Sequence, residues 1–165
     1  VQTCALPISG PFSVELDAFR AAAGALEDQA LNAAVRRIEP LAAQGVPTLD
    51  ALRRRFDRDA PAALATLDGE AQTWTDAVLR NLRGLVRVRR TGEQQPDTDA
   101  GRIARAEGLL VQGELAEAIV QVRALPPSAR AALAGWLSDA DARVSAESAA
   151  DVIAARVVAL VTAQP

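Results

Sequence analysis

The chain lacks most of the side chains on which enzymes rely. It contains no histidine, lysine, methionine or tyrosine, and it has a single cysteine, Cys4. The usual general base, the amine of a Schiff base and the soft ligands of a zinc site are therefore missing. Two carboxylate pairs remain, Glu15 with Asp17 and Asp139 with Asp141, but residues two apart on a helix point in different directions. Unless two such acids converge in one pocket, this spacing favours solvated helix faces.

Phosphate-binding signatures are also missing, because neither a Walker-type loop nor a dinucleotide-binding glycine pattern occurs. The net charge is only −3, which excludes a basic protein built for nucleic acid. We therefore predict no enzyme activity, no catalytic residue, no cofactor, no metal, no nucleic-acid partner and no small-molecule substrate.

Long hydrophobic runs are absent as well. A membrane-spanning helix needs roughly 20 apolar residues. The most apolar stretch, residues 152–161, is ten residues long and carries Arg156 in its middle. This pattern predicts an amphipathic helix at that end of the sequence.

What is abundant is alanine, at about one residue in five, while aromatic residues make up only 3%. Small side chains at this frequency favour helices that pack closely. We predict an all-α fold, an irregular bundle of about six to eight helices with a C-terminal helical hairpin and a long terminal helix.

Helical periodicity and breaker residues predict where the elements lie. Pro11 opens a first helix that ends near Gly24, and a second runs over about 27–44, kinked or split by Pro40 and ended by Gly45. The buried positions expected on these helices are Phe12, Leu16, Phe19, Ala23, Leu31, Val35, Ile38 and Leu41.

Thr48 is expected to cap a third helix, LDALRRRF, and Asp59 to start a separate one that runs to about Leu67. The pair Asp68-Gly69 is expected to interrupt the chain before another helix. That helix would carry Trp74, Val78, Leu79 and Leu82, and the alternating segment 85–90 would follow as an extended connector.

The last part of the sequence predicts a hairpin of two helices, 100–112 and 114–125, with Gly113 as the hinge. After Pro126-Pro127 a final helical region covers 128–162. Because Ser138 and Asp141 have capping-box spacing, this region is either one bent helix or two.

The segment LDALRRRFDRDAPAALATL combines an apolar stripe with a cluster of arginines. The stripe consists of Leu49, Leu52, Phe56, Ala60 or Ala63, and Leu67. Such a helix suits a membrane interface, where the ring and leucines enter the acyl boundary and guanidiniums pair with lipid phosphates. The same pattern also describes an ordinary helix with its stripe in the protein core. The candidate lipid-binding residues are Leu52, Arg53, Arg54, Arg55, Phe56 and Arg58.

A second candidate is the hairpin LLVQGELAEAIVQVRALPP, in which Gly113, Ala118 and Val122 are spaced much as in a tetratricopeptide unit. No second copy occurs at a 34-residue period, so two antiparallel helices of a bundle explain it equally. The alternative function is therefore a tetratricopeptide-like helical adaptor that binds a protein and does not touch lipid.

An ordered series of segments resembles the C-terminal domain of the mitofilins. In chain order these are GPFSVELDAF, GVPTLDALRRRF, LRGLVRVRR before a polar loop, ARAEGLLVQGELAEAIVQVRALP, and a helix containing Trp136. The resemblance covers nearly everything from Gly10 to about Val161. The alanine- and arginine-rich composition is similar to that of the alphaproteobacterial branch.

The resemblance implies a membrane-organising scaffold without catalytic activity, anchored in the bacterial inner membrane by a helix outside this fragment and facing the periplasm. It implies binding to an anionic membrane surface, and the family's L-x-x-R-F segment matches Leu52, Arg55 and Phe56. It also implies contact with outer-membrane Omp85-type assembly proteins and a homo-oligomer that associates through Val144, Ile153, Val157 and Leu160.

The first residues, VQTCALPIS, match nothing downstream. Residues 1–8 correspond to the translation of a common sequencing adapter, so we predict an artefactual, disordered leader over 1–9. A single helical domain is then expected over 10–165. Its N-terminal part would cover 10–91, a loop 92–99, and its C-terminal part 100–165.

Overall fold

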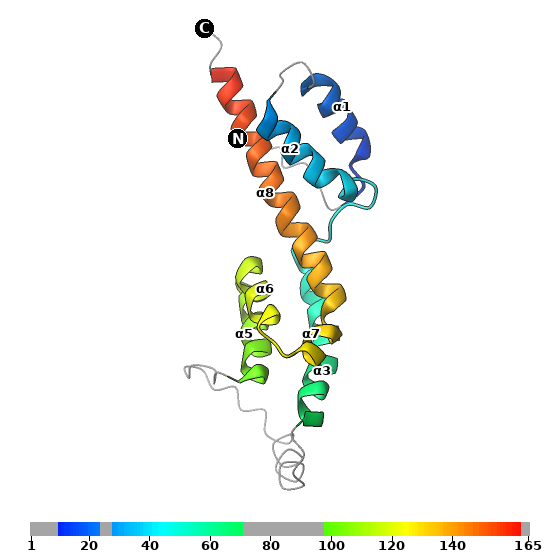
Figure 1. Ribbon diagram of the computed structural model, residues 1–165, viewed down its shortest axis with the longest axis vertical. Helices are drawn as coiled ribbons and strands as arrows, with labels where there is room; N and C mark the ends of the chain where they lie inside the picture. The colour runs from blue at the N-terminus through cyan, green and yellow to red at the C-terminus, as the bar shows by residue number, and fades with distance from the viewer. Residues whose placement is uncertain (1–9, 24–27, 71–97, 163–165) are drawn as a thin grey trace. The chain divides into compact units, whose positions relative to one another are not determined.

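A computed structural model describes residues 10–23, 28–70 and 98–162 (Figure 1). These residues contain helices and turns and no strand, which confirms the predicted all-α class. The predicted helix around Trp74, the connector 85–90 and the leader 1–9 lie outside the described residues. The helices are α1 (Ser13–Ala23), α2 (Gln29–Ile38), the 3₁₀ helix η2 (Glu39–Leu41), α3 (Leu49–Glu70), α5 (Asp99–Gln112), α6 (Leu115–Arg123), α7 (Pro127–Ala132) and α8 (Ala134–Thr162).

The described residues form two compact units. The first contains α1, α2, η2 and the part of α8 that begins at Ser138. The second contains α3, α5, α6, α7 and the start of α8, up to Leu137. Most of the loop predicted to divide the domain, residues 92–97, lies outside the described residues, so that division stays a prediction.

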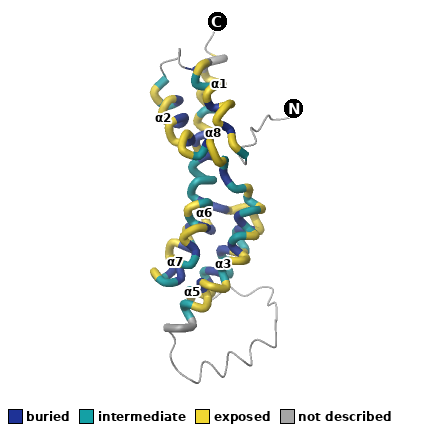
Figure 2. The backbone as a smooth tube through the Cα atoms, turned by 90° about the vertical axis from the view of Figure 1, so that its right-hand side faces the viewer, coloured by how far each residue is buried: buried dark blue, intermediate teal, exposed yellow. Residues whose placement is uncertain are grey.

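The first unit is held together by one apolar cluster to which α1, α2 and α8 all contribute (Figure 2). Backbone pairing reinforces it, because the Phe12 N–H donates to the Ala42 carbonyl at 2.8 Å. Burying each large apolar side chain contributes about 1.5–3 kcal/mol. The cluster consists of Phe12, Leu16, Ala34, Val35, Ile38, Ala42, Val46, Ala146 and Ala149, with Phe19, Leu41, Ala142 and Ile153 packed against it.

Helix α2 begins and ends where its local chemistry requires. Asp28 caps it by accepting a hydrogen bond from the Leu31 N–H at 2.9 Å. The α-helix stops at Ile38 because Pro40 has no N–H and its ring disfavours a continued α-helix. The predicted split at Pro40 is confirmed, and a 3₁₀ turn continues the chain.

Gly45 then closes this turn in a conformation that favours glycine. Its φ is +73°, and its N–H donates to the Leu41 carbonyl at 2.7 Å. A Cβ at this position would lie 2.6 Å from the carbonyl carbon of Gly10. Both the left-handed backbone and the close approach therefore need a residue without a side chain.

Helix α3 is longer than the sequence predicts. It runs without interruption from Leu49 to Glu70 and contains Pro61 inside it, so the predicted second start at Asp59 and the break at Asp68-Gly69 are wrong. Proline disfavours a helix interior by about 3 kcal/mol. Ala63, two residues later, is fully buried, and such tertiary packing stabilises a helix that local propensity disfavours.

The predicted hairpin is confirmed as α5 and α6. The hydroxyl of Thr98 accepts from the Gly101 N–H at 3.1 Å and starts α5. Gly113 ends it with φ +93°, and the Glu114 N–H donates back to the Leu109 carbonyl at 2.9 Å. This left-handed glycine turns the chain into the antiparallel partner helix.

The final helical region is two helices, one of the two possibilities that the sequence left open, and the break lies at Leu133 and not at Ser138. Pro127 occupies the first turn of α7, which ends at Ala132. Leu133, fully buried, separates it from α8, while Ser138 lies inside α8 and caps nothing. The burial of Leu133 fixes the break where no capping residue marks it.

Candidate functional site

The arginine-rich segment of α3, residues 52–58, belongs to the second unit. Its apolar stripe faces inward: Leu52 is 0% exposed and Phe56 is 1% exposed, and Ala63 continues the same buried face. This is the core placement that the sequence pattern also allowed. In this conformation neither Leu52 nor Phe56 is accessible to an acyl chain.

Trp136, in the first turn of α8, covers this stripe. Its ring meets that of Phe56 edge-on, with centroids 5.0 Å apart and planes at 69°. Its indole Nε1–H donates to the Leu52 carbonyl at 3.0 Å. A carbonyl oxygen has two lone pairs, so this bond adds to the helical one that the same oxygen accepts.

The sequence pattern alone does not assign Trp136 to the arginine-rich site of α3. In the sequence, Trp136 is notable only as part of a helix that resembles the mitofilin family. A signal was available, since a tryptophan in an alanine-rich helix is expected to be buried and its N–H then needs an acceptor. The acceptor itself lies 84 positions away in the sequence, beyond what a local pattern indicates.

Arg53 binds backbone carbonyls at the end of another helix. Its Nε donates to the Leu110 carbonyl at 2.6 Å and its Nη2 to the Val111 carbonyl at 3.1 Å. These carbonyls belong to the last turn of α5, where a positive charge is favourable, and the Leu110 carbonyl also accepts from the Gly113 N–H at 3.2 Å. The guanidinium of Arg53 therefore ties α3 to α5.

Arg55 is half-buried and lies against the backbone of α8. Its Nε is 3.5 Å from Oδ2 of Asp59, and its guanidinium occupies the space beside Gly135. A Cβ on Gly135 would lie 3.4 Å from the Cζ of Arg55 and would overlap its Nη2. The missing side chain at Gly135 is what leaves room for this guanidinium.

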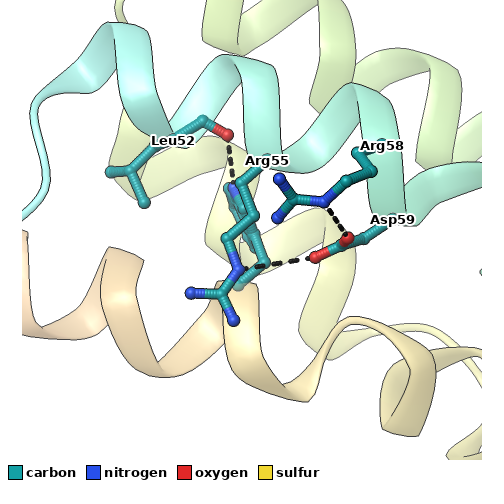
Figure 3. Close-up of polar contacts among 5 residues, drawn as sticks. Leu52, Arg55, Arg58 and Asp59 are labelled. Atoms are coloured by element: carbon teal, nitrogen blue, oxygen red, sulfur yellow. Dashed lines mark hydrogen bonds and ion pairs between the residues drawn. The ribbon is translucent and has the colours of Figure 1, made fainter.

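Arg54 and Arg58 are the exposed cations of the segment, with side chains 68% and 69% exposed. Arg54 pairs with Asp50, one turn earlier. The Nε of Arg58 lies 3.2 Å from Oδ1 of Asp59, so Arg55 and Arg58 reach the same carboxylate (Figure 3). Of the six predicted lipid-binding residues, these two present their charge to solvent most fully.

The predicted self-association residues lie on α8 in the first unit, at different depths. Val144 is half-buried, Ile153 packs against the apolar cluster, and Val157 is 39% exposed. Leu160 lies within α8, but its side chain is outside the described residues. Two further valines on this stretch, Val152 and Val158, are 37% and 62% exposed.

A surface ion pair in the first unit shifts the titration of both its members. The Nη2 of Arg20 lies 2.6 Å from Oε2 of Glu39. The hydrogen bond, and next the Coulomb attraction, lower the pKa of Glu39. The hydrogen bond to Glu39 raises the pKa of Arg20.

Within the described ranges, no three acidic, histidine or cysteine side chains gather as metal ligands. Within the same ranges, no helix has the length and apolar character needed to cross a membrane. The candidate site is the exposed face of α3 on which Arg54 and Arg58 pair with carboxylates.

The family model Mitofilin, described as mitochondrial inner membrane protein, matches residues 3–157. The match includes residues 3–8, and their assignment to a translated adapter stays a prediction. No curated protein and no solved structure matches the chain.

Proposed function

This chain belongs to the mitofilin family, and from that premise we propose that it is a membrane-organising scaffold domain of an inner-membrane protein. In this proposal the exposed guanidiniums of α3 bind an anionic membrane surface, and the C-terminal half of α8 joins copies of the domain. Together, lipid binding and self-association would hold an array of domains on the membrane surface and support membrane invaginations.

The observation that carries the proposal is the pair of exposed guanidiniums, Arg54 and Arg58. They are four residues apart, so they lie on one face of α3, about 6 Å apart along its axis. A guanidinium matches a phosphate with two parallel hydrogen bonds. Two guanidiniums one turn apart suit the dense phosphates of a lipid surface.

Contact through Arg54 and Arg58 leaves the core of the second unit closed. Insertion of Leu52 and Phe56 would require separating α3 from Trp136, with loss of the ring contact and the indole hydrogen bond. We therefore propose that the guanidiniums of Arg54 and Arg58 make the first membrane contact. Insertion of Leu52 and Phe56 would be a second step, for which the membrane surface would have to supply the free energy.

Self-association is supported by exposed valines on α8. Val152, Val157 and Val158 leave apolar surface on α8, in a stretch where Ile153 packs against the apolar cluster and residues 154–159 are exposed. Covering such surface with a second copy is favourable at about 25 cal/mol per Å². The weak lipid contact of one domain would then be multiplied by the oligomer.

The family description places the relatives in the mitochondrial inner membrane. For this chain we propose the bacterial inner membrane, with the domain on the periplasmic side. An Omp85-type assembly protein of the outer membrane is the proposed protein partner across that space.

Vesicle co-sedimentation tests the lipid site. Arg54→Glu with Arg58→Glu reverses two exposed charges without touching the core. Arg36→Glu with Arg37→Glu is the matched control, since both residues are exposed on α2 and the net charge changes equally. We expect the first pair to release the protein from anionic vesicles and the control to retain most binding. Equal loss in both would show that net charge alone matters.

Sedimentation velocity tests self-association. Val157→Asp with Val158→Asp puts charge on the exposed face of α8, and Val14→Asp places a charge on an exposed valine of α1, 77% accessible. The α8 variant is expected to sediment as a smaller species than the parent, and the α1 variant as the parent does. A monomeric parent, or equal behaviour of both variants, would remove this interface from the proposal.

A protein-binding adaptor is the second candidate, favoured by two exposed valines on the α5–α6 hairpin. Val111 is 71% exposed and Val120 is 61% exposed, while Ala118 and Val122 are buried as a bundle requires. This function predicts no binding to anionic vesicles at low salt. It also predicts capture of a periplasmic protein that Val111→Asp with Val120→Asp abolishes.

A further inference from the structure

We propose that Asp50 and Asp59 are internal counter-ions of the lipid site, which a lipid phosphate must displace before the domain binds. The two carboxylates would thereby set how much negative charge a membrane must carry. This inference rests on the proposed function, because it concerns the same guanidiniums.

The contacts that carry the inference all lie within α3. Asp50 pairs with Arg54, and Asp59 lies 3.2 Å from the Nε of Arg58 and 3.5 Å from the Nε of Arg55 (Figure 3). Each exposed guanidinium of the segment thus has a carboxylate of its own helix as an ion-pair partner. A phosphate reaching Arg54 or Arg58 meets a site that is already paired.

The charge of the segment is nearly balanced. Residues 50–59 contain four arginines and three aspartates, and the Arg53 guanidinium donates to carbonyls of α5. Seen from a distance, this helix face attracts an anionic surface only weakly. Its affinity for the membrane comes from exchanging the carboxylate partners of the guanidiniums for lipid phosphates at short range. It does not come from a net positive patch.

Such an exchange is feasible because the guanidiniums of Arg54 and Arg58 are exposed, although the side chain of Asp59 is only 24% exposed. The side chain of Asp50 is 67% exposed and that of Arg54 is 68% exposed, so water and salt screen their attraction. At an anionic membrane the local surface potential repels the carboxylate and attracts the guanidinium at once. Both effects favour replacing the carboxylate with a phosphate.

The consequence is that binding requires a minimum fraction of anionic lipid in the membrane. A surface with few anionic lipids offers too little potential to displace the carboxylates, and the guanidiniums stay paired within the helix. Above a certain anionic fraction, the phosphates outcompete Asp50 and Asp59. The site would thus distinguish a densely anionic membrane region from a sparse one.

Three charge-neutralising variants of the full chain test this. Asp50→Asn and Asp59→Asn each remove a counter-ion of an exposed arginine. Asp57→Asn is the matched control, since Asp57 is exposed on the same helix and loses the same charge. The probe is a series of vesicles with graded fractions of phosphatidylglycerol in phosphatidylcholine, and circular dichroism checks that each variant keeps its helices.

We expect Asp50→Asn and Asp59→Asn each to bind about fivefold more tightly than the parent at an intermediate anionic fraction, the gain for one freed arginine near an anionic surface. Both should also need less phosphatidylglycerol for half-maximal binding. Asp57→Asn should gain clearly less. Equal gains in all three variants, or none, would overturn the counter-ion role.

The arginine variants separate this failure from failure of the proposed function. If the parent binds and Arg54→Glu with Arg58→Glu abolishes binding, the lipid site stands whatever the aspartate variants do. If parent and aspartate variants alike fail to bind vesicles of pure phosphatidylglycerol, the lipid site itself is wrong and the counter-ion role is overturned with it.

Discussion

The indole N–H of Trp136 donates a hydrogen bond to the backbone carbonyl of Leu52, 3.0 Å away. The bond joins the first turn of α8 to the arginine-rich segment of α3 and holds the aromatic ring over Phe56. It fixes which face of α3 is core and which is free. The guanidiniums of Arg54 and Arg58 lie on the exposed side of α3, because Leu52 and Phe56 occupy the covered side.

Phe56→Ala is expected to lower the free energy of unfolding by about 3–5 kcal/mol, because it removes a buried ring and its edge contact with Trp136. Urea denaturation measures the change. Leu64→Ala, on the same helix but 36% exposed, should cost clearly less. Similar losses in both variants would contradict the burial of Phe56. Loss of lipid binding in a Phe56 variant would therefore report unfolding as well as contact.

Arg53→Ala is expected to destabilise the domain by about 1–3 kcal/mol, because the carbonyls of Leu110 and Val111 lose a charged donor. Arg53→Lys should recover only part of this, since an ammonium lacks the planar pair of donors. Arg54→Ala is the control, and should change stability by less than about 1 kcal/mol. Thermal unfolding midpoints of the three variants measure the order of their stabilities. Equal midpoints for Arg53→Ala and Arg54→Ala would refute the stabilising role of the Arg53 hydrogen bonds to α5.

Two glycine substitutions are expected to act in opposite directions. Gly45→Ala should destabilise by more than about 1 kcal/mol, because its φ is +73° and a Cβ would meet the backbone of Gly10. Gly108→Ala should stabilise by about 0.5–1 kcal/mol, because Gly108 lies inside α5 with open space around its Cα. Chemical denaturation of both variants measures the sign, and a tolerated Gly45→Ala would contradict the close approach.

The pair Arg20–Glu39 gives a pH dependence with a definite sign. The pKa of Glu39 is lowered in the folded state, so its contribution is present above the pKa of an unfolded glutamate and is lost as pH falls through the lowered value. Glu39→Gln should therefore reduce stability at neutral pH and match the parent in strong acid. Unfolding midpoints measured across the acidic range test this. A constant difference between the two proteins would assign the effect to something other than titration.

How far the sequence predicts this fold is seen best in α3. Its apolar stripe follows from helical spacing, and the burial of Leu52 and Phe56 agrees with one of the two meanings that spacing allowed. Its continuity through Pro61 does not follow, because local propensity disfavours a proline inside a helix, whereas tertiary burial, as at Ala63, favours the helix.

In the other elements, a boundary could be predicted from the sequence where it is determined by residues close together in the chain, and not where it is determined by tertiary packing. The turn at Gly113 was predicted because a left-handed C-terminal residue is a property of the backbone at one position. The sequence left open whether residues 128–162 form one helix or two, and it did not indicate the break at Leu133, because this residue is buried and no capping side chain marks the break. The partners of Arg53 could not be predicted from a local pattern either, because its guanidinium reaches carbonyls 57 and 58 positions away.

The most direct test of the membrane-binding account compares two double variants of equal charge on phosphatidylglycerol vesicles. With about 1 kcal/mol per arginine near an anionic surface, Arg54→Glu with Arg58→Glu should weaken binding by roughly thirtyfold. Arg36→Glu with Arg37→Glu should stay within a few-fold of the parent. If the two double variants bind equally, the guanidiniums of α3 are not the membrane site.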